Sequence, residues 1–486
     1  MSGSLPSSFQ YFASKIAGVS RKSIRVQPVN STTVKNNQSI TFDMPSDAII
    51  DLTSCVFRGD FKYTNAVGST NGLRFVPQPH SLVRAEQWSL NGQVVNGQSC
   101  NHKGQIYEAV RRASMGKSGD ASHHDEYMRV PTPWPLGAQA GGNAVSRLYG
   151  DDNEDVASNA QSRRIHYKAF WGLAQTPNSE SWDTAICGQT RVRLELAGTE
   201  VCMSQADSGT TDYDWQIDNC ELVLDVISFA DNTYDMLMSQ LLSNPESELL
   251  IPCTNYVSQI DTASASLKFN VSTNSLDCLC FAGLNANYAS PTEYTTTTGV
   301  LPANTLAYGA NNSKFTLYKS DGTLYSAADA LSDASTNQSF YYMVNGITMP
   351  QYGAVNVQDS LEFTKQVYSH GKDDRNILFA GWKPADSLKD DGAAQTERGL
   401  LLDRDAGIFF RRCNALDNNY IVCMKTALTA PAAQSRVASG ISTLGTSSQV
   451  SLNLQNFDNG DQPILQWAVC SSILSVRGGQ QVAVQY

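Results

Sequence analysis

The sequence has no apolar run of the roughly 20 residues that a membrane-spanning helix needs. The longest candidate, residues 463–476, contains Gln466, Ser471 and Ser472, so a β-strand is the better interpretation. The N-terminal residues lack the charged start and continuous apolar core of a secretory signal. We therefore expect neither a transmembrane span nor a secretory leader.

Charged residues are scarce, at 17% of the chain, which suits a surface of polar strands and loops rather than charged helices. The 11 cysteines are an odd number without regular spacing, which fits a reducing compartment better than an oxidising one. Cys278 and Cys280 would share one face of a strand, and we interpret them as buried small residues rather than a redox pair. With 486 residues and 41% hydrophobic residues, the chain can form two or more domains with real cores.

Motifs for catalysis, cofactor binding and metal binding fail on inspection. Residues 116–118 read Gly-Lys-Ser, but Arg111 stands where a phosphate loop needs glycine. Residues 440–445 have one residue too many for a nucleophile elbow. The adjacent acidic and histidine residues 123–126 would not converge on one metal ion. We expect no enzyme, with no catalytic residue, cofactor or metal.

The second half of the chain repeats the first, about 255 residues later. Residues 85–95 read AEQWSLNGQVV, and residues 338–350 read QSFYYMVNGITMP. Each is a strand-like run broken by Asn-Gly, and Asn91 and Asn345 are 254 positions apart. Asn-Gly accepts the positive φ of a two-residue hairpin, so both pairs are predicted to be turns in equivalent places.

Three further pairs keep the same order: helix-like 104–116 with 359–371 at an offset of 255, 166–174 with 420–428 at 254, and 192–196 with 450–454 at 258. Residue identity within the pairs is poor. Their order and near-constant offset nevertheless indicate that one β-rich unit occurs twice. Strand spacing, loop lengths and the few helices favour β-sandwiches over a parallel α/β sheet.

Basic residues are concentrated near the N-terminus. Residues 1–42 carry five basic residues and no acidic residue, while the remainder has 30 basic and 46 acidic residues. The body should therefore not bind nucleic acid through a broad electrostatic surface. The basic arm would suit an acidic partner, although a plain flexible arm is an equally good interpretation.

Several segments together resemble the double jelly-roll major capsid proteins of icosahedral DNA viruses, which include virophages, polinton-like viruses and tailless membrane-containing phages. The resemblance rests on element order, turn placement and size in these segments: 50–63, 81–95, 341–352, 439–454 and 482–486. It covers most of residues 20–486.

The resemblance implies an all-β fold of two tandem jelly-roll β-sandwiches with short helices and long loops. The predicted units are an N-terminal arm (1–24), a first jelly roll (25–250) and a second jelly roll (251–486). It also implies a major capsid protein that self-assembles as pseudo-hexameric homotrimers into a virion shell, after synthesis in the host cytoplasm or nucleus. Implied partners are neighbouring capsomers, penton and minor capsid proteins, and an internal membrane or the genome through the arm.

Assembly residues are expected in the arm, where an amphipathic helix and basic side chains occur together. On composition and position, the candidates are Phe9, Phe12, Ile16, Arg21, Lys22 and Arg25. Two alternatives remain at this point: another virion surface protein such as a spike or penton, and a carbohydrate-binding or carbohydrate-cleaving β-sandwich protein. A glycosidase would need two carboxylates converging in a cleft.

Overall fold

The structure is a computed structural model that describes a defined part of the chain. The described residues are 19–65, 82–96, 100–102, 106, 163–167, 181–199, 203–205, 214–229, 236, 239, 243, 248–262, 264–283, 292–294, 339–356, 359–368, 422–429, 437–445, 449–455, 463–477 and 481–485.

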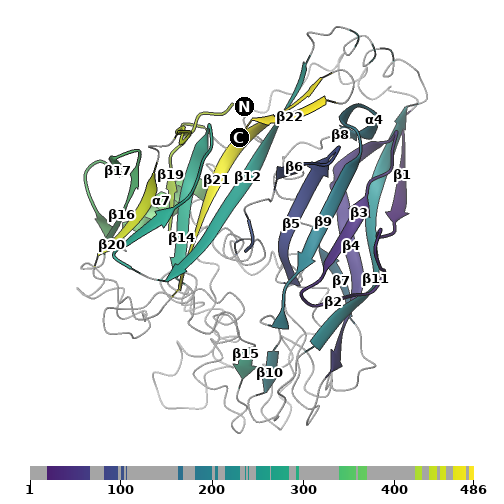
Figure 1. Ribbon diagram of the computed structural model, residues 1–486, viewed down its shortest axis with the longest axis horizontal. Helices are drawn as coiled ribbons and strands as arrows, with labels where there is room; N and C mark the ends of the chain where they lie inside the picture. The colour runs from purple at the N-terminus through teal and green to yellow at the C-terminus, as the bar shows by residue number, and fades with distance from the viewer. Residues whose placement is uncertain are drawn as a thin grey trace, which may run out of the picture.

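Two antiparallel sheets form the first unit (Figure 1). The β1 sheet has the order β1 (Val19–Val26), β11 (Asp214–Phe229), β4 (Ile49–Asn65), β7 (Arg163–Tyr167), with β2 (Val34–Lys35) on β11 and β8 (Ser181–Asp183) on β4. The β3 sheet has the order β3 (Ser39–Asp43), β9 (Thr190–Leu196), β5 (Val83–Leu90), β6 (Gln93–Asn96). The short helix α4 (Thr184–Cys187) lies between β8 and β9.

Two more antiparallel sheets form the second unit. The β12 sheet has the order β12 (Glu248–Thr262), β21 (Pro463–Arg477), β14 (Leu276–Gly283), β19 (Val422–Lys425), with β22 (Gln481–Gln485) on β21. The β13 sheet has the order β13 (Ser266–Phe269), β20 (Val450–Gln455), β16 (Ser339–Val344), β17 (Ile347–Met349), with β18 (Val355–Asn356) on β16. Helix α7 (Ser360–Tyr368) packs on β19. The short strands β10 (Met203–Gln205) and β15 (Thr292–Tyr294) pair in parallel and join segments of the two units.

The two units have the same topology, because the four-strand order of each sheet in the first unit is repeated in a sheet of the second. The sheet order β1-β11-β4-β7 corresponds to β12-β21-β14-β19, and β3-β9-β5-β6 corresponds to β13-β20-β16-β17. In chain order, the eight strands of these paths alternate between the two sheets of each unit, except that the hairpin strands β5–β6 and β16–β17 lie in one sheet, as in a jelly roll. The predicted repetition and the predicted pair of jelly rolls are therefore confirmed.

The repeated segments that the structure describes lie in equivalent places in the two units. The Asn-Gly pairs form the β5–β6 and β16–β17 turns, with φ of 48° and 83° in the first and 52° and 79° in the second. Residues 192–196 and 450–454 lie in the matching strands β9 and β20. Of the helix-like pair, 359–371 contains α7, whereas 104–116 lies outside the described residues except for Ile106.

The boundaries of the units can be compared with the predicted ones. Strand β1 begins at Val19, so it takes in the last residues of the predicted arm, 1–24. Strand β12 begins at Glu248, close to the predicted division between residues 250 and 251. Residues 1–18 lie outside the described part of the chain.

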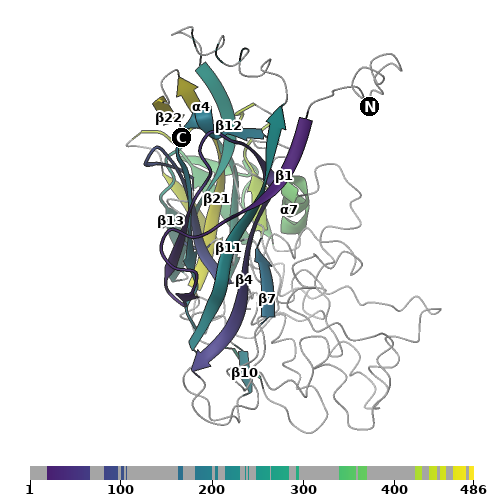
Figure 2. The ribbon, with the colours of Figure 1, turned by 90° about the vertical axis from the view of Figure 1, so that its right-hand side faces the viewer.

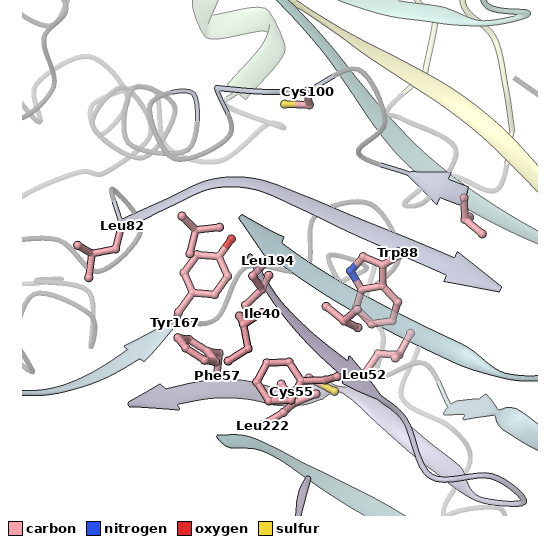
Figure 3. Close-up of a cluster of buried hydrophobic side chains, with 14 of the residues drawn as sticks. Ile40, Leu52, Cys55, Phe57, Leu82, Trp88, Cys100, Tyr167, Leu194 and Leu222 are labelled. Atoms are coloured by element: carbon pink, nitrogen blue, oxygen red, sulfur yellow. The ribbon is translucent and has the colours of Figure 1, made fainter. Parts of the chain in front are cut away.

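Alternating strands bury one face in each sandwich. In β3, Ile40 and Phe42 are fully buried while their neighbours are partly exposed. In β5, Glu86 lies on the same inner face, where its carboxylate accepts hydrogen bonds from Trp88 Nε1 (2.8 Å) and Tyr167 Oη (2.9 Å). Because Tyr167 comes from β7, this buried carboxylate joins the two sheets of the first unit. Figure 3 shows Trp88 and Tyr167 among the buried side chains of this unit.

One buried apolar cluster extends from the first unit into the second. It includes the interior of the first sandwich, Cys100 just after β6, and the face of the β12 sheet that carries Cys280, Trp467 and Val469. Figure 3 shows Cys100 pointing away from the first interior, near the strands of the β12 sheet. A second cluster, with Phe281 and Phe340 at a ring separation of 5.1 Å, fills the interior of the second sandwich. The two units are therefore joined by packed, buried side chains and not only by the connecting chain.

Candidate functional site

The outer face of the β1 sheet is the most heavily charged surface among the described residues. The sheet forms the side of the molecule that faces the viewer in Figure 2. Alternation along β1 directs Ile24 and Val26 toward the interior and places Arg21, Ser23 and Arg25 on the opposite face. Ser23 is directly opposite Asp225 of β11, so the two residues share this outer face.

Arg21 connects three strands through two carboxylates. Its Nη2 lies 2.8 Å from Asp51 Oδ2 of β4, and its Nε lies 2.5 Å from Asp225 Oδ2 of β11. Ser23 Oγ donates to the other oxygen of Asp225. The hydrogen bond from Ser23, together with that from Arg21 and its charge, outweighs burial and lowers the pKa of Asp225. Asp225 therefore stays ionised and holds the edge strand β1 against the sheet.

A second ion-pair group surrounds Glu221. Arg164 of β7 reaches Glu221 Oε1 at 3.2 Å and Asp60 Oδ1 at 2.9 Å. Arg25 Nη1 is 3.7 Å from Glu221 Oε2, which is a looser contact. Asn219 Nδ2 donates to the second oxygen of Asp60. Two arginines from opposite edges of the sheet thus meet over one carboxylate.

A β-bulge shapes the surface at this point. The register between β11 and β4 shifts between Asp218 and Glu221, and Asn219 takes a left-handed φ of 50°. Gly59 faces the bulge, where an added Cβ would lie only 2.2 Å from Cγ2 of Ile217. The bulge leaves a pocket of about 380 Å³, lined by Arg25, Gln27, Thr32, Arg164, Asn219 and Glu221.

The arginine side chains of this surface are much more exposed to solvent than the carboxylates with which they pair. The side chains of Arg21, Arg25 and Arg164 are 55%, 68% and 41% exposed. Their carboxylate partners Asp51 and Glu221 are only 3% and 9% exposed. The guanidinium groups are therefore the part of this surface that solvent or a partner contacts, although the ion-pair network contains both positive and negative side chains.

The structure places the six predicted assembly residues in two classes. Phe9, Phe12 and Ile16 lie outside the described residues. Arg21, Lys22 and Arg25 lie on β1 and are exposed, so they belong to a paired strand of the first sandwich. Their role in assembly stays a prediction.

Sequence reasoning missed the partners of these arginines. Arg164 lies near the start of β7, outside the segments that the sequence analysis singled out as candidates for assembly. Glu221 and Asp225 lie four positions apart on β11, so alternation alone places both on one face. The even spacing of these two carboxylates along the strand was the available signal.

Two of the remaining candidate motifs, residues 116–118 and 123–126, lie outside the part of the chain that the structure describes. Within the described part, no three His, Cys, Asp or Glu side chains gather closely enough to hold a metal ion. Among the helices described, none is long and apolar enough to cross a membrane.

The structure does describe segment 440–445 and the two cysteines Cys278 and Cys280, for which the sequence analysis also supplies an interpretation. Segment 440–445 pairs with 273–276 through backbone hydrogen bonds of Ile441 with Leu276 and of Thr443 with Thr273. A Cβ added at Gly440 would lie 2.3 Å from the carbonyl oxygen of Leu276, so the glycine allows this close backbone approach. Cys278 and Cys280 are buried, as predicted, but Cys280 also forms a disulfide with Cys423 of the neighbouring strand. The sequence did not predict this bond, because its two cysteines are 143 positions apart.

No protein-family model matches the chain, and no curated protein matches it. Solved structures do. PBCV-1 VP54, in a crystal structure fitted into a cryo-EM reconstruction of the virophage Sputnik, gives a TM-score of 0.55 at 10% identity, covering 96% of this chain and 97% of that chain. The quasi-atomic model of the PBCV-1 virus capsid gives 0.54 at 10% identity, with 96% and 97% covered. The Faustovirus major capsid protein gives 0.49 at 11% identity, with 98% and 92% covered.

The two PBCV-1 structures match both units and nearly the full length of both chains. They agree with the duplicated strand order described above. In its fold, this chain is a double jelly-roll protein, and it shares that fold with PBCV-1 VP54.

Proposed function

We propose that this chain is a major capsid protein that self-assembles as pseudo-hexameric homotrimers into an icosahedral virion shell. The observation that carries the proposal is the duplicated jelly roll, which matches a virus capsid structure over 96% of the chain. A shell subunit needs stable surfaces rather than a reaction centre. The proposal therefore includes a structural role without enzymatic activity.

Symmetry gives a physical reason for two similar units in one chain. Closed homo-oligomers are the default for identical subunits, and three copies would present six similar sandwiches around one axis. Such a particle can meet six neighbours in similar ways, so one protein can tile a hexagonal lattice. Each contact can be modest, because many form together.

The proposed location is the virion, with synthesis in the host cytoplasm or nucleus. The proposed partners are further copies of this chain, neighbouring capsomers, and penton and minor capsid proteins. The N-terminal arm, residues 1–18 ahead of β1, would contact an internal membrane or the genome. Its basic residue Lys15 and the absence of acidic residues in that stretch support an acidic partner.

The mass of the purified protein in solution tests the proposal. Light scattering after size exclusion should give a particle near three times the chain mass of 52.8 kDa. Electron microscopy of concentrated samples should then show particles of hexagonal outline. A monomer at every concentration would contradict the proposal, and a carbohydrate array would then test the β-sandwich alternative.

A further inference from the structure

The corresponding outer faces of the two units differ in chemistry. In the β12 sheet, the face carrying Cys280, Leu465 and Trp467 is apolar and belongs to the buried cluster shared with the first unit. In the β1 sheet, the corresponding face carries Arg21, Arg25 and their carboxylates instead. One face is thus permanently covered within the chain, whereas its counterpart is polar and open to solvent.

A polar face of this kind suits reversible contact between folded proteins. Apolar faces resemble a divided core and favour permanent association, while charged faces govern encounter rate and partner choice. The β1 sheet already satisfies its own carboxylates, so it does not need a partner to be stable. Its exposed guanidinium groups remain available for a second interaction.

Arg25 is the side chain best placed for that interaction. It is 68% exposed, and its nearest oxygen of Glu221 is 3.7 Å away, beyond a good hydrogen bond. Arg164 occupies the other oxygen of Glu221 at 3.2 Å. An incoming carboxylate could therefore be bound by Arg25 without displacing the ion pairs that hold the sheet.

The pocket beside Arg25 has further groups suited to a carboxylate. Besides the two arginines and Glu221, its lining comprises the amides of Gln27 and Asn219 and the hydroxyl of Thr32. Amides and hydroxyls donate hydrogen bonds that can accommodate the second oxygen of a carboxylate. Its volume of about 380 Å³ is large enough for one or two side chains.

A second copy of this chain has the right charge to be the partner. The chain carries a formal net charge of −11, although residues 1–42 are basic. We propose that the outer face of the β1 sheet, centred on the Arg25 pocket, is a docking surface for acidic side chains of a second copy. This inference rests on the proposed function to the extent that both require self-association.

Charge reversal at Arg25 tests the inference. Sedimentation velocity on the full chain would give the self-association constant for wild type, Arg25→Glu and the control Arg193→Glu. Arg193 is a good match because it is 46% exposed and ion-paired with Glu195, but lies on the β3 sheet of the same unit. Arg25→Glu should weaken self-association about tenfold or more, and added salt should narrow the difference by screening.

The outcomes separate this inference from the proposed function. If wild type assembles and Arg25→Glu assembles equally well, the docking surface is wrong while the capsid role stands. Equal weakening by Arg193→Glu would also overturn it, because the effect would then follow net charge. Loss of binding to anionic vesicles with self-association unchanged would assign the face to a lipid surface and overturn it too. If wild type never associates, both proposals fail.

Arg25→Gln provides a second variant in case Arg25→Glu disturbs the strand. It removes the positive charge without placing two carboxylates side by side. It should keep the melting temperature of wild type and weaken self-association by a smaller factor. An unchanged association constant in this variant would also contradict the proposal.

Discussion

Asp277 is a nearly fully buried carboxylate of the second unit, and two serine hydroxyls donate hydrogen bonds to it. Ser275 Oγ donates to its Oδ1 at 2.9 Å, and Ser471 Oγ donates to its Oδ2. Burial raises the pKa of Asp277, and the hydrogen bonds from Ser471 and Ser275 only partly oppose this effect. The ionised form is therefore less favourable in the folded protein than in the unfolded chain.

This difference predicts how stability depends on pH. A raised folded pKa means that the contribution of Asp277 is fully present below the unfolded pKa of about 3.9 and is lost as pH rises through the folded pKa. Asp277→Asn removes this titration while keeping the size of the side chain. The free energy of unfolding of wild type, relative to Asp277→Asn, should fall as pH rises from about 4 toward neutral.

Urea unfolding at several pH values provides the measurement. Asp225→Asn is a control of opposite sign, because the lowered pKa of Asp225 gives stability above the unfolded pKa that is lost in acid. A wild-type advantage over Asp277→Asn that is the same at every pH would contradict the prediction.

The sequence identified only the arginines of β1 within the charged surface. Arg21 and Arg25 were found because they lie in a segment without acidic residues. Their carboxylate partners could not be assigned from the sequence, because Asp225 is 204 positions from Arg21 and only the sheet order brings the two together. Arg21 had therefore been assigned to the predicted arm, 1–24, although it lies in strand β1.

The two Asn-Gly hairpins show how similar elements arise from poorly similar sequences. Asn91 N donates to Gln189 O, and Asn345 N donates to Gln449 O, so each turn is bonded to the same position of the adjacent strand. Gly92 and Gly346 have positive φ and open space where a Cβ would lie. The glycines are thus required for backbone conformation and not for packing.

Equal turns should respond equally to substitution. Gly92→Ala and Gly346→Ala should each lower the free energy of unfolding by about 1 kcal/mol, the cost of a left-handed alanine. Chemical denaturation of each variant would measure this. A cost several times larger in one unit than in the other would contradict the equivalence of the two hairpins.

Element prediction succeeded where one face is buried and failed where it is not. Strands β9 and β20 were located from their apolar alternation, and both inner faces are buried. The first residues of β1 were assigned to the predicted arm, 1–24, because Ser20, Arg21 and Lys22 show no apolar alternation. Ion pairs rather than apolar burial hold that end of the strand, and periodicity does not detect them.

At the scale of the whole molecule, the sequence predicted two units but not how they are joined. The link is the apolar cluster that runs from the first sandwich through Cys100 to the β12 sheet. Trp467 lies on the side of the β12 sheet within this cluster, whereas Phe340 belongs to the separate cluster of the second sandwich. Both side chains are fully buried, so truncation of either should cost a similar free energy.

This arrangement predicts that the two units unfold together in wild type. Separate domains commonly unfold in separate steps, but a shared core makes the loss of one unit expose part of the other. Trp467→Ala should lower the free energy of unfolding by about 3–5 kcal/mol and also weaken the link between units. Its denaturation should split into two transitions, with the second unit unfolding first.

Phe340→Ala is the matched control, because it should cost a similar amount while leaving the shared cluster complete. Calorimetry of wild type and both variants would resolve the transitions. Phe340→Ala should move a single transition to lower temperature. If wild type already melts in two steps, or if Phe340→Ala splits the transition as Trp467→Ala does, the shared cluster does not couple the two jelly rolls.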